Sequence, residues 1–324
     1  MPGWNERIQS GTETYLTWRK RRTWRKKEKQ KKKNPVVDWL EAFLWAAGVV
    51  LLINQYLFQA YQIPSGSMME TLLIKDRIFV NKLVYGPELI PGMGKLPSPV
   101  KPERGEVIIF ESPVYLSKGP AFDVLQRLLY MLTLSLVDID RDEYGQPRAH
   151  FLIKRAVGVA GDRVRFNRGN VELMPPGYEN WVEEETYKAE QGMEYTARRL
   201  VNRKTYDDIL ASARADAYLY AGIAPEAADL EAAGNTSTAG EDMFAWSGYR
   251  YETLYALNPQ SRRYGSTWRR WEMGWYLPEG WIFPLGDNRD RSKDARYFGP
   301  VRLKKVLGRA MFKYWPLHRI GGIH

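Results

Sequence analysis

Two serine hydroxyls lie two residues apart in the segment Ile63-Pro64-Ser65-Gly66-Ser67, directly after a long apolar run. Pro64 restricts its own φ and favours an extended conformation for Ile63, whereas Gly66 permits backbone shapes that a Cβ would resist. A rigid turn of this kind could present one hydroxyl as a nucleophile and the other as a hydrogen-bond donor beside it. Because Ser-Gly-Ser loops are also common without any catalytic role, the turn alone does not define a function.

A serine nucleophile needs a base, and the sequence supplies few candidates. There is no cysteine, and there are only three histidines, His150, His318 and His324. This small number disfavours a Ser-His-Asp triad and a histidine metal site. Lys154 is embedded in the apolar part of His150–Phe166, which has the pattern of a strand, a glycine turn and a second strand. A buried lysine whose pKa is lowered until it is neutral is a competent general base. An outward-facing strand lysine is the simpler alternative.

A third polar segment follows an apolar strand near the C-terminus. Residues 285–301 begin Leu-Gly-Asp-Asn-Arg-Asp-Arg-Ser-Lys-Asp-Ala-Arg, which includes Ser292, Asp294 and Arg296. So many short polar side chains predict a hydrogen-bonded loop that orients other groups, although a plain surface turn has the same composition.

The elements that position these groups begin with a basic tail and an apolar segment. Residues 1–34 carry 12 Lys or Arg and 3 Glu, whereas the remaining 290 residues are almost neutral in net charge. Residues 39–60 are mostly apolar and, at about 1.5 Å per residue, are long enough to cross a bilayer as a helix. Trp39 and Trp45 lie towards one end and Tyr56 and Tyr61 towards the other, as aromatic belts do. A cleaved signal peptide and a buried globular helix remain the alternatives.

The positive-inside rule places the basic tail in the cytoplasm and the rest of the chain on the outer side of the membrane. The tail is predicted to be disordered or a frayed helix at the membrane surface, and a merely solvated tail is the alternative. A basic arm that binds nucleic acid is disfavoured, because the basic residues stop where the apolar segment begins.

Further segments have simpler patterns. Alternating residues in 72–85 and the apolar run in 104–110 predict strands. Residues 124–137 have leucines at helical spacing but are short for a span, which favours a core or interfacial helix. Residues 138–142 resemble the start of a calcium loop, but Glu143 and Ala149 stand where glycine and glutamate are required, so a solvated turn is expected. Residues 167–270 show no catalytic constellation and are interpreted as an insertion.

Together these segments resemble the bacterial type I signal peptidases, the membrane-anchored Ser/Lys proteases of the leader peptidase family. The resemblance rests on I-P-S-G-S-M-M-x-T-L, R-G-E-V-I-I-F, I-K-R-A-V-G-x-x-G-D and L-G-D-N-R-D-x-S-x-D-A-R, in that order, over about half of the chain. It implies Ser67 as nucleophile and Lys154 as general base. Ser65 and the backbone N–H of Ser67 would form the oxyanion hole, and Ser292 would orient the lysine ammonium.

The resemblance also implies a supporting loop and a substrate pocket. Asp294 and Arg296 would hold the loop under the site as an ion pair. The pocket for the small side chains at substrate positions −1 and −3 would be lined by Tyr61, Ile63, Met68, Leu72 and Ile153. The chain departs from the family pattern at Glu70 and Ala160, where many members carry proline. Both are turn positions, so these departures affect the expected shape of the loops and not the expected pairing of Ser67 with Lys154.

The resemblance implies a mainly β fold of antiparallel sheets, as in signal peptidases and LexA-type repressors, with one transmembrane helix and a helical or irregular insertion. We expect a basic cytoplasmic tail (1–38), a transmembrane helix (39–60), a catalytic β domain (61–166 and 271–324) and an inserted subdomain (167–270). The expected function is removal of signal peptides from exported preproteins at the outer face of the cytoplasmic membrane. Expected partners are signal peptides and membrane lipid, with the translocation machinery as a further candidate. No metal, cofactor or nucleic acid is expected.

Three other classes of protein remain as alternatives. A non-catalytic membrane-anchored binding protein could keep this fold, and a soluble Ser/Lys autoprotease of the repressor type could carry the basic tail on DNA. A nuclear or ribosomal basic protein is disfavoured because the charge is confined to the tail.

Overall fold

The computed structural model describes residues 12–24, 34–90, 93–145, 148, 150–234 and 242–323. Contacts divide the chain into two units, Met1–Leu51 and Leu52–His324. In the first unit, residues 12–24 of the predicted basic tail (1–38) are helical, and residues 35–38 already belong to the apolar helix. The apolar helix α2 (Pro35–Tyr56) begins in the first unit, and its last turn belongs to the second.

Helix α2 is the one helix in the described ranges that is long and apolar enough to cross a membrane, with a mean hydropathy of 2.0. Pro35 suits the first helical position, where its missing N–H removes no intrahelical bond. The helix lies about four residues closer to the N-terminus than the predicted span of 39–60. The reason is that Phe58–Gln62 leaves the helix and pairs with a strand, so the chain is already extended there.

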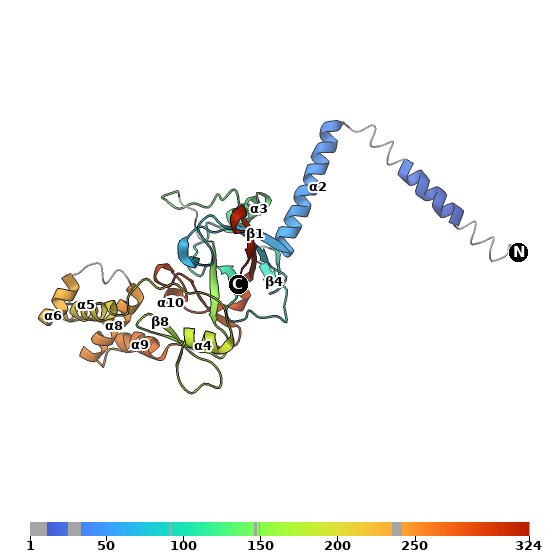
Figure 1. Ribbon diagram of the computed structural model, residues 1–324. Helices are drawn as coiled ribbons and strands as arrows, with labels where there is room; N and C mark the ends of the chain where they lie inside the picture. The colour runs from blue at the N-terminus through green and yellow to red at the C-terminus, as the bar shows by residue number, and fades with distance from the viewer. Residues whose placement is uncertain are drawn as a thin grey trace. The chain divides into compact units, whose positions relative to one another are not determined.

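The second unit is built on an antiparallel sheet with the strand order β1-β2-β13-β5-β6-β11-β12, in which β14 also pairs with β13 (Figure 1). A separate hairpin, β3–β4, precedes β5. The mainly antiparallel β fold with one N-terminal apolar helix is therefore confirmed. The bounds are β1 Phe58–Gln62, β2 Arg77–Asn81, β3 Glu88–Ile90, β4 Met93–Lys95, β5 Val107–Glu111, β6 Phe151–Gly158, β11 Trp281–Leu285, β12 Val301–Arg302, β13 Val306–Trp315 and β14 Gly321–Gly322.

Strand β5 shows how the sheet is buried. Val107 and Ile109 belong to one hydrophobic cluster, and Ile108 and Phe110 belong to another. Because successive side chains of a strand point to opposite faces, β5 is covered on both faces. This explains its continuous apolar run, which a half-exposed strand would not need.

A second antiparallel sheet has the order β10-β7-β8-β9. Its hairpin turns at Arg168 and Gly169, which both have positive φ, as in a type I′ turn. The predicted domain boundary between 166 and 167 falls inside this hairpin. The first strand after the boundary, β8, pairs with β7, which lies almost entirely before it. The bounds are β7 Arg163–Asn167, β8 Asn170–Met174, β9 Val182–Glu183 and β10 Trp275–Tyr276.

The remaining helices are mostly in the segment 167–270. Four of them, α5, α6, α8 and α9, pack on one another as a helical layer (Figure 1). Helix α3, in contrast, lies between β5 and β6 in the chain. The bounds are α3 Pro120–Leu132, α4 Glu184–Gln191, α5 Thr205–Tyr220, α6 Ala227–Gly234, α8 Met243–Leu257, α9 Arg262–Met273 and α10 Ala295–Phe298.

Candidate active site

The two serines lie on a short turn between β1 and β2. Ser65 is extended, with φ −138° and ψ 161°, and Gly66–Met68 forms one turn of 3₁₀ helix. The Ser65 hydroxyl donates a hydrogen bond to Ser67 Oγ at 3.4 Å. Asn288 holds the turn from the far end of the chain: its Nδ2 donates to Gly66 O at 3.0 Å, and its backbone N–H donates to Ser67 O at 3.1 Å.

Lys154 is the fourth residue of β6, and its side chain reaches the same turn. Its Nζ lies 2.7 Å from Ser67 Oγ and donates to the carbonyl oxygen of Ile153 at 2.9 Å. Only 3% of the lysine is exposed. The alternative of a solvent-facing strand lysine is therefore wrong: β6 is covered on both faces over this stretch, so either face would bury the side chain.

The surroundings of Lys154 favour its neutral form. Burial lowers the pKa of Lys154 from its usual value to about 8, although Asp294 and Asp287 act in the opposite direction. Desolvation exceeds the attraction of the two carboxylates because the amine is enclosed almost completely. A neutral amine at 2.7 Å from a serine oxygen is placed to accept the hydroxyl proton.

Ser292 does not make the contact that the sequence predicts. In the described part of the chain no hydrogen bond joins its buried Oγ to Lys154, whose amine bonds instead to Ser67 and to the Ile153 carbonyl. The Ser292 hydroxyl lies near the Asp294 carboxyl and helps to lower its pKa. Gly286 brings the loop close, because a Cβ there would overlap Ser292 Oγ and the carbonyl oxygen of Ser67. Ser292 thus lies near the backbone of Ser67, and the second acceptor that the Lys154 amine binds is the carbonyl of Ile153.

Asp294 and Arg296 form a buried ion pair under the loop. Arg296 Nε lies 2.9 Å from Asp294 Oδ1, and the other carboxylate oxygen accepts the Gly286 N–H at 3.0 Å. The Arg296 guanidinium also lowers the pKa of Asp294, against the effect of its burial. The pair therefore holds both ends of the segment 286–296 together.

A second buried ion pair was not among the site residues predicted from the sequence. Arg155 binds Asp287 through two hydrogen bonds, Nε to Oδ1 at 2.8 Å and Nη2 to Oδ2 at 2.7 Å, and neither side chain is exposed. Thr71 donates to Asp287 Oδ2 at 2.6 Å and accepts from Arg155. This group connects β6 to the segment after the serine turn. The available signal was Arg155 beside Lys154 in an otherwise apolar strand.

The inserted segment also reaches this loop. Arg289 forms a buried ion pair with Glu184 of α4, and the hydroxyl of Tyr195 donates to the same carboxylate at 2.7 Å. The backbone N–H of Arg198 donates to the carbonyl of Asp287, and that of Arg289 donates to the carbonyl of Arg198. The segment therefore braces the loop that contacts the serine turn, which nothing in its own composition indicated.

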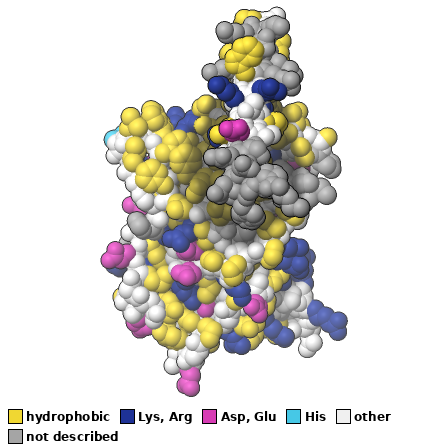
Figure 2. Space-filling model, turned by 90° about the vertical axis from the view of Figure 1, so that its right-hand side faces the viewer, with side chains coloured by type: hydrophobic (Ala, Val, Ile, Leu, Met, Phe, Trp, Pro, Cys, Tyr) yellow, Lys and Arg dark blue, Asp and Glu magenta, His cyan; other side chains and the backbone are white. Residues whose placement is uncertain are grey.

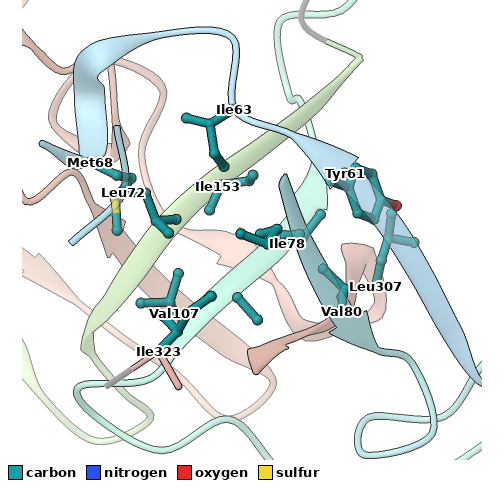
Figure 3. Packing of buried hydrophobic residues seen from close by; sticks show 12 residues of the cluster. Tyr61, Ile63, Met68, Leu72, Ile78, Val80, Val107, Ile153, Leu307 and Ile323 are labelled. Atoms are coloured by element: carbon teal, nitrogen blue, oxygen red, sulfur yellow. The ribbon is translucent and has the colours of Figure 1, made fainter. Parts of the chain in front are cut away.

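The five predicted pocket residues belong to one buried hydrophobic cluster, against which Tyr130 and Phe151 pack. Figure 3 shows Ile63, Ile153 and Leu72 pointing toward one another beside Met68. Tyr61, Ile63 and Ile153 also line a cleft of about 370 Å³, which continues past His150 to helix α3. Met68 and Leu72 are completely buried in the cluster beneath it.

Glu70, one of the two departures from the family pattern, has φ +89°. A proline ring, which holds φ near −65°, could not adopt that backbone conformation. The turn therefore follows a path here that differs from that of members with proline. In the described part of the chain, no three His, Asp or Glu side chains come together as they would around a metal ion.

Comparison with known proteins agrees with this geometry. A family model described as signal peptidase, peptidase S26, matches residues 36–315. The chain is 26% identical to signal peptidase I of Haemophilus influenzae over 87% of this chain and 70% of that protein. It is 24% identical to signal peptidase I of Buchnera aphidicola over 91% and 84% of the two chains, respectively. With signal peptidase I of Aquifex aeolicus it shares 27% identity over 82% and 79%.

Proposed function

Because the chain belongs to the peptidase S26 family of bacterial signal peptidases, we propose that it cleaves signal peptides from exported preproteins with a Ser67–Lys154 dyad. The observation that carries this proposal is the buried amine of Lys154 at 2.7 Å from Ser67 Oγ. A serine at its free pKa is a poor nucleophile, and a neutral lysine at hydrogen-bond distance supplies the missing base.

In this mechanism Lys154 removes the proton of Ser67 as its Oγ attacks the scissile carbonyl. The developing oxyanion accepts hydrogen bonds from the Ser65 hydroxyl and the backbone N–H of Ser67. The protonated lysine then gives its proton to the leaving amine, and an acyl-enzyme forms at Ser67 Oγ. Lys154 next activates a water that hydrolyses the ester, which restores both side chains.

Four residues of the 286–296 loop position the reacting groups without touching the substrate: Asn288, Ser292, Asp294 and Arg296. Asn288 holds the carbonyls of the serine turn, and the Asp294–Arg296 pair fixes the loop that carries Asn288. We assign Ser292 to packing between this loop and the nucleophile's backbone.

The cleft supports a preference for small side chains at positions −1 and −3 of the substrate. Strand β11 pairs with β6 only from Arg155 onward. The preceding residues of β6 therefore have one edge without a β-strand partner, and Phe151 and Ile153 of this stretch line the cleft. An extended peptide along this side would place alternate side chains against Ile63 and Ile153, and then against Tyr61. Because these walls are already closely packed by the cluster behind them, bulky side chains would be excluded sterically.

We propose that α2 crosses the cytoplasmic membrane once, with the basic N-terminal tail inside and the catalytic domain outside. The basic tail supports this orientation by the positive-inside rule. Lipid and the translocation machinery would then be its neighbours. A soluble Ser/Lys autoprotease remains the rival for localisation, and carbonate extraction of membranes separates the two: release of the full chain into the soluble fraction would contradict a spanning helix.

The direct test is cleavage of a preprotein by the full chain and by its Ser67→Ala variant. The wild type is expected to release the mature protein at one site, after small residues, and the variant to leave the precursor intact, because alanine removes the hydroxyl that lies 2.7 Å from the Lys154 amine. Gel analysis and the N-terminal sequence of the product measure both outcomes. Equal processing by the two proteins would contradict the dyad, and no processing by the wild type would favour the non-catalytic binding protein.

The pH dependence of cleavage is expected to follow the ionisation of Lys154. Its pKa of about 8 means that the neutral, active form gains population as the pH rises through that value. The rate kcat/KM should therefore rise about tenfold per pH unit well below pH 8 and level off above it. The measurement is kcat/KM for a peptide substrate between pH 6 and pH 10.

His150 is the necessary control for this profile, because it lines the cleft and its own pKa is lowered by burial and by Arg127. In a His150→Gln variant the rise should keep its midpoint near pH 8. A profile that loses its rise in this variant would assign the titration to the histidine instead.

A further inference from the structure

One stretch of the inserted segment runs alongside the loop that holds the serine turn. The backbone N–H of Arg198 donates to Asp287 O at 2.6 Å, and the Arg289 N–H donates to Arg198 O at 3.0 Å. Arg198 and Asn288 are therefore paired as a parallel β-bridge. Because the backbone N–H of Asn288 donates to Ser67 O at 3.1 Å, Arg198 lies one strand spacing from a residue that contacts the nucleophile's backbone.

The side chain of Arg198 leads from this bridge back to the serine turn. Its Nη1 lies 3.4 Å from Glu70 Oε1, and the two side chains are 40% and 43% exposed. Glu70 follows Ser67 by three residues. Neither Arg198 nor Glu70 lines the cleft that contains Tyr61 and Ile153. A half-exposed ion pair therefore lies close to the nucleophile but outside the cleft.

The path of the substrate across Ser67 places this pair on the side of the mature protein. In the proposed binding mode the residues before the scissile bond lie against Ile153 and earlier residues, so the residues after it continue in the opposite direction. Along β6 that direction leads to Arg155, whose Cζ lies 4.4 Å from the centre of the Tyr195 ring. Tyr195 precedes Arg198 by three residues. The inserted segment thus covers the end of β6 toward which the mature chain would leave.

The accessible charges at this end are mostly positive. The 286–296 loop exposes Arg291 and Lys293. Its aspartates are enclosed in ion pairs, with side chains at most 4% exposed: Asp287, Asp290 and Asp294. On the face drawn in Figure 2, in contrast, basic and acidic side chains are interspersed. Together with Arg198, the loop therefore offers three accessible basic side chains, and Glu70 is the acid that meets them. A local excess of one sign favours a partner of the opposite sign.

We propose that Arg198, with Glu70 as its partner in the free enzyme, forms a subsite that selects preproteins with an acidic residue near the start of the mature sequence. The inference rests on the proposed peptidase function and extends it to the other side of the scissile bond. An acidic substrate side chain replaces Glu70 as the partner of Arg198, whereas a lysine meets only the excess of positive charge. Because an extended chain advances about 3.3 Å per residue, only about the first four mature residues come within reach of the pair.

The test uses one preprotein that is varied at a single mature position. Glu, Gln or Lys is placed in turn at mature positions 2, 3 and 4, and kcat/KM is measured with the full chain in detergent at low salt. At the most sensitive position, the wild type is expected to cleave the Glu substrate about threefold to tenfold faster than the Lys substrate. This ratio should fall toward one at high salt, because ions screen exposed charges. The Gln substrates measure the peptidase function independently of charge.

Variants of the pair assign the preference to its side chains. Arg198→Gln should bring the Glu/Lys ratio close to one, and Arg198→Glu should invert it. Glu70→Gln should increase the ratio, because Arg198 then has no competing carboxylate beside it. The bonds of Arg198 to the loop are made by its backbone, so these replacements leave them in place. The matched control is Arg263→Glu, which makes the same change of charge at an exposed arginine of α9 and should leave the ratio unchanged.

The outcomes separate this subsite from the peptidase function itself. Equal cleavage of the Glu, Gln and Lys substrates by the wild type would overturn the subsite and leave the peptidase function in place. An Arg198→Glu variant that slows all substrates by the same factor would show a purely structural arginine, which also overturns the subsite. The same holds if Arg263→Glu changes the ratio as much as Arg198→Glu does. Failure to cleave any of the substrates, including those with Gln, would overturn both proposals.

Discussion

Replacing Lys154 by methionine is expected to abolish preprotein cleavage while leaving the protein folded. Methionine has nearly the same volume and fills the buried space, but it has no group that can accept the Ser67 proton. The rate should fall by about 10⁴-fold or more, as it does when the base of a nucleophile–base pair is removed from a serine protease. Lys154→Ala should be equally inactive. Single-turnover cleavage of a preprotein measures the loss, and thermal unfolding checks the fold.

The expected stability of this variant follows from the same burial that activates the lysine. The pKa of Lys154 is about 8 in the folded protein and near 10.5 in an unfolded chain, so between pH 8 and pH 10.5 the unfolded state binds the additional proton, and below pH 8 both states are protonated. The lysine therefore destabilises the fold at neutral pH, and this cost declines as the pH rises from 8 toward 10.5. A methionine removes it, so Lys154→Met should unfold at the same temperature as the wild type or at a higher one.

Ser65→Ala is the matched comparison, because it removes a hydroxyl from the same turn but leaves the dyad intact. The loss of one oxyanion donor typically costs about 10²–10³ in rate, so this variant should be impaired but still measurable. If Lys154→Met cleaved at a rate close to that of Ser65→Ala or faster, the lysine would not be the base, and the mechanism would be wrong.

The order of these effects could be derived from the sequence, whereas the geometry that produces them could not. The motif around Ser67 and the lysine in an apolar strand indicated both partners. The choice between an inward and an outward Lys154 depends on what covers β6, and that cover comes from strands far away in the chain. In a half-buried strand, the alternation of apolar and polar residues shows which face is buried. A strand buried on both faces has no such alternation, so the sequence does not show which way Lys154 points.

Pairs between distant residues were the main omission. Arg155 and Asp287 are 132 positions apart, and Glu184 lies in a segment that shows no catalytic pattern. Neither pairing follows from local composition, because any of several carboxylates could satisfy a buried arginine. Ser292 is the opposite case: its position in the motif indicated a residue close to the site, but the Lys154 amine donates to the Ile153 carbonyl, and the orienting role of Ser292 stays a prediction. A sequence motif can indicate that a side chain lies near a site. Its hydrogen-bond partner depends on how distant segments pack together, which the motif does not show.

The Arg155–Asp287 pair carries the second large prediction. Asp287→Ala leaves the guanidinium of Arg155 buried without its bidentate partner, and the loss of one member of such a pair typically costs about 3–5 kcal/mol. The thermal midpoint of the full chain in detergent should fall by about 10 °C. The matched control is Glu279→Ala, which breaks an ion pair of 2.6 Å whose side chains are 58% and 80% exposed. That change should alter stability by about 0–1 kcal/mol, because water screens the exposed pair.

A double replacement separates the stability of this pair from its effect on the active site. Arg155→Met with Asp287→Leu removes both charges and should recover most of the stability that Asp287→Ala loses, because no unpaired buried charge remains. Its cleavage rate should stay low, since Thr71 loses the acceptor that joins the segment after the serine turn to the 286–296 loop. Recovery of both stability and rate would show that the pair only fills space. Recovery of neither would show that the loop depends on Asp287 for its hydrogen bonds rather than for its charge.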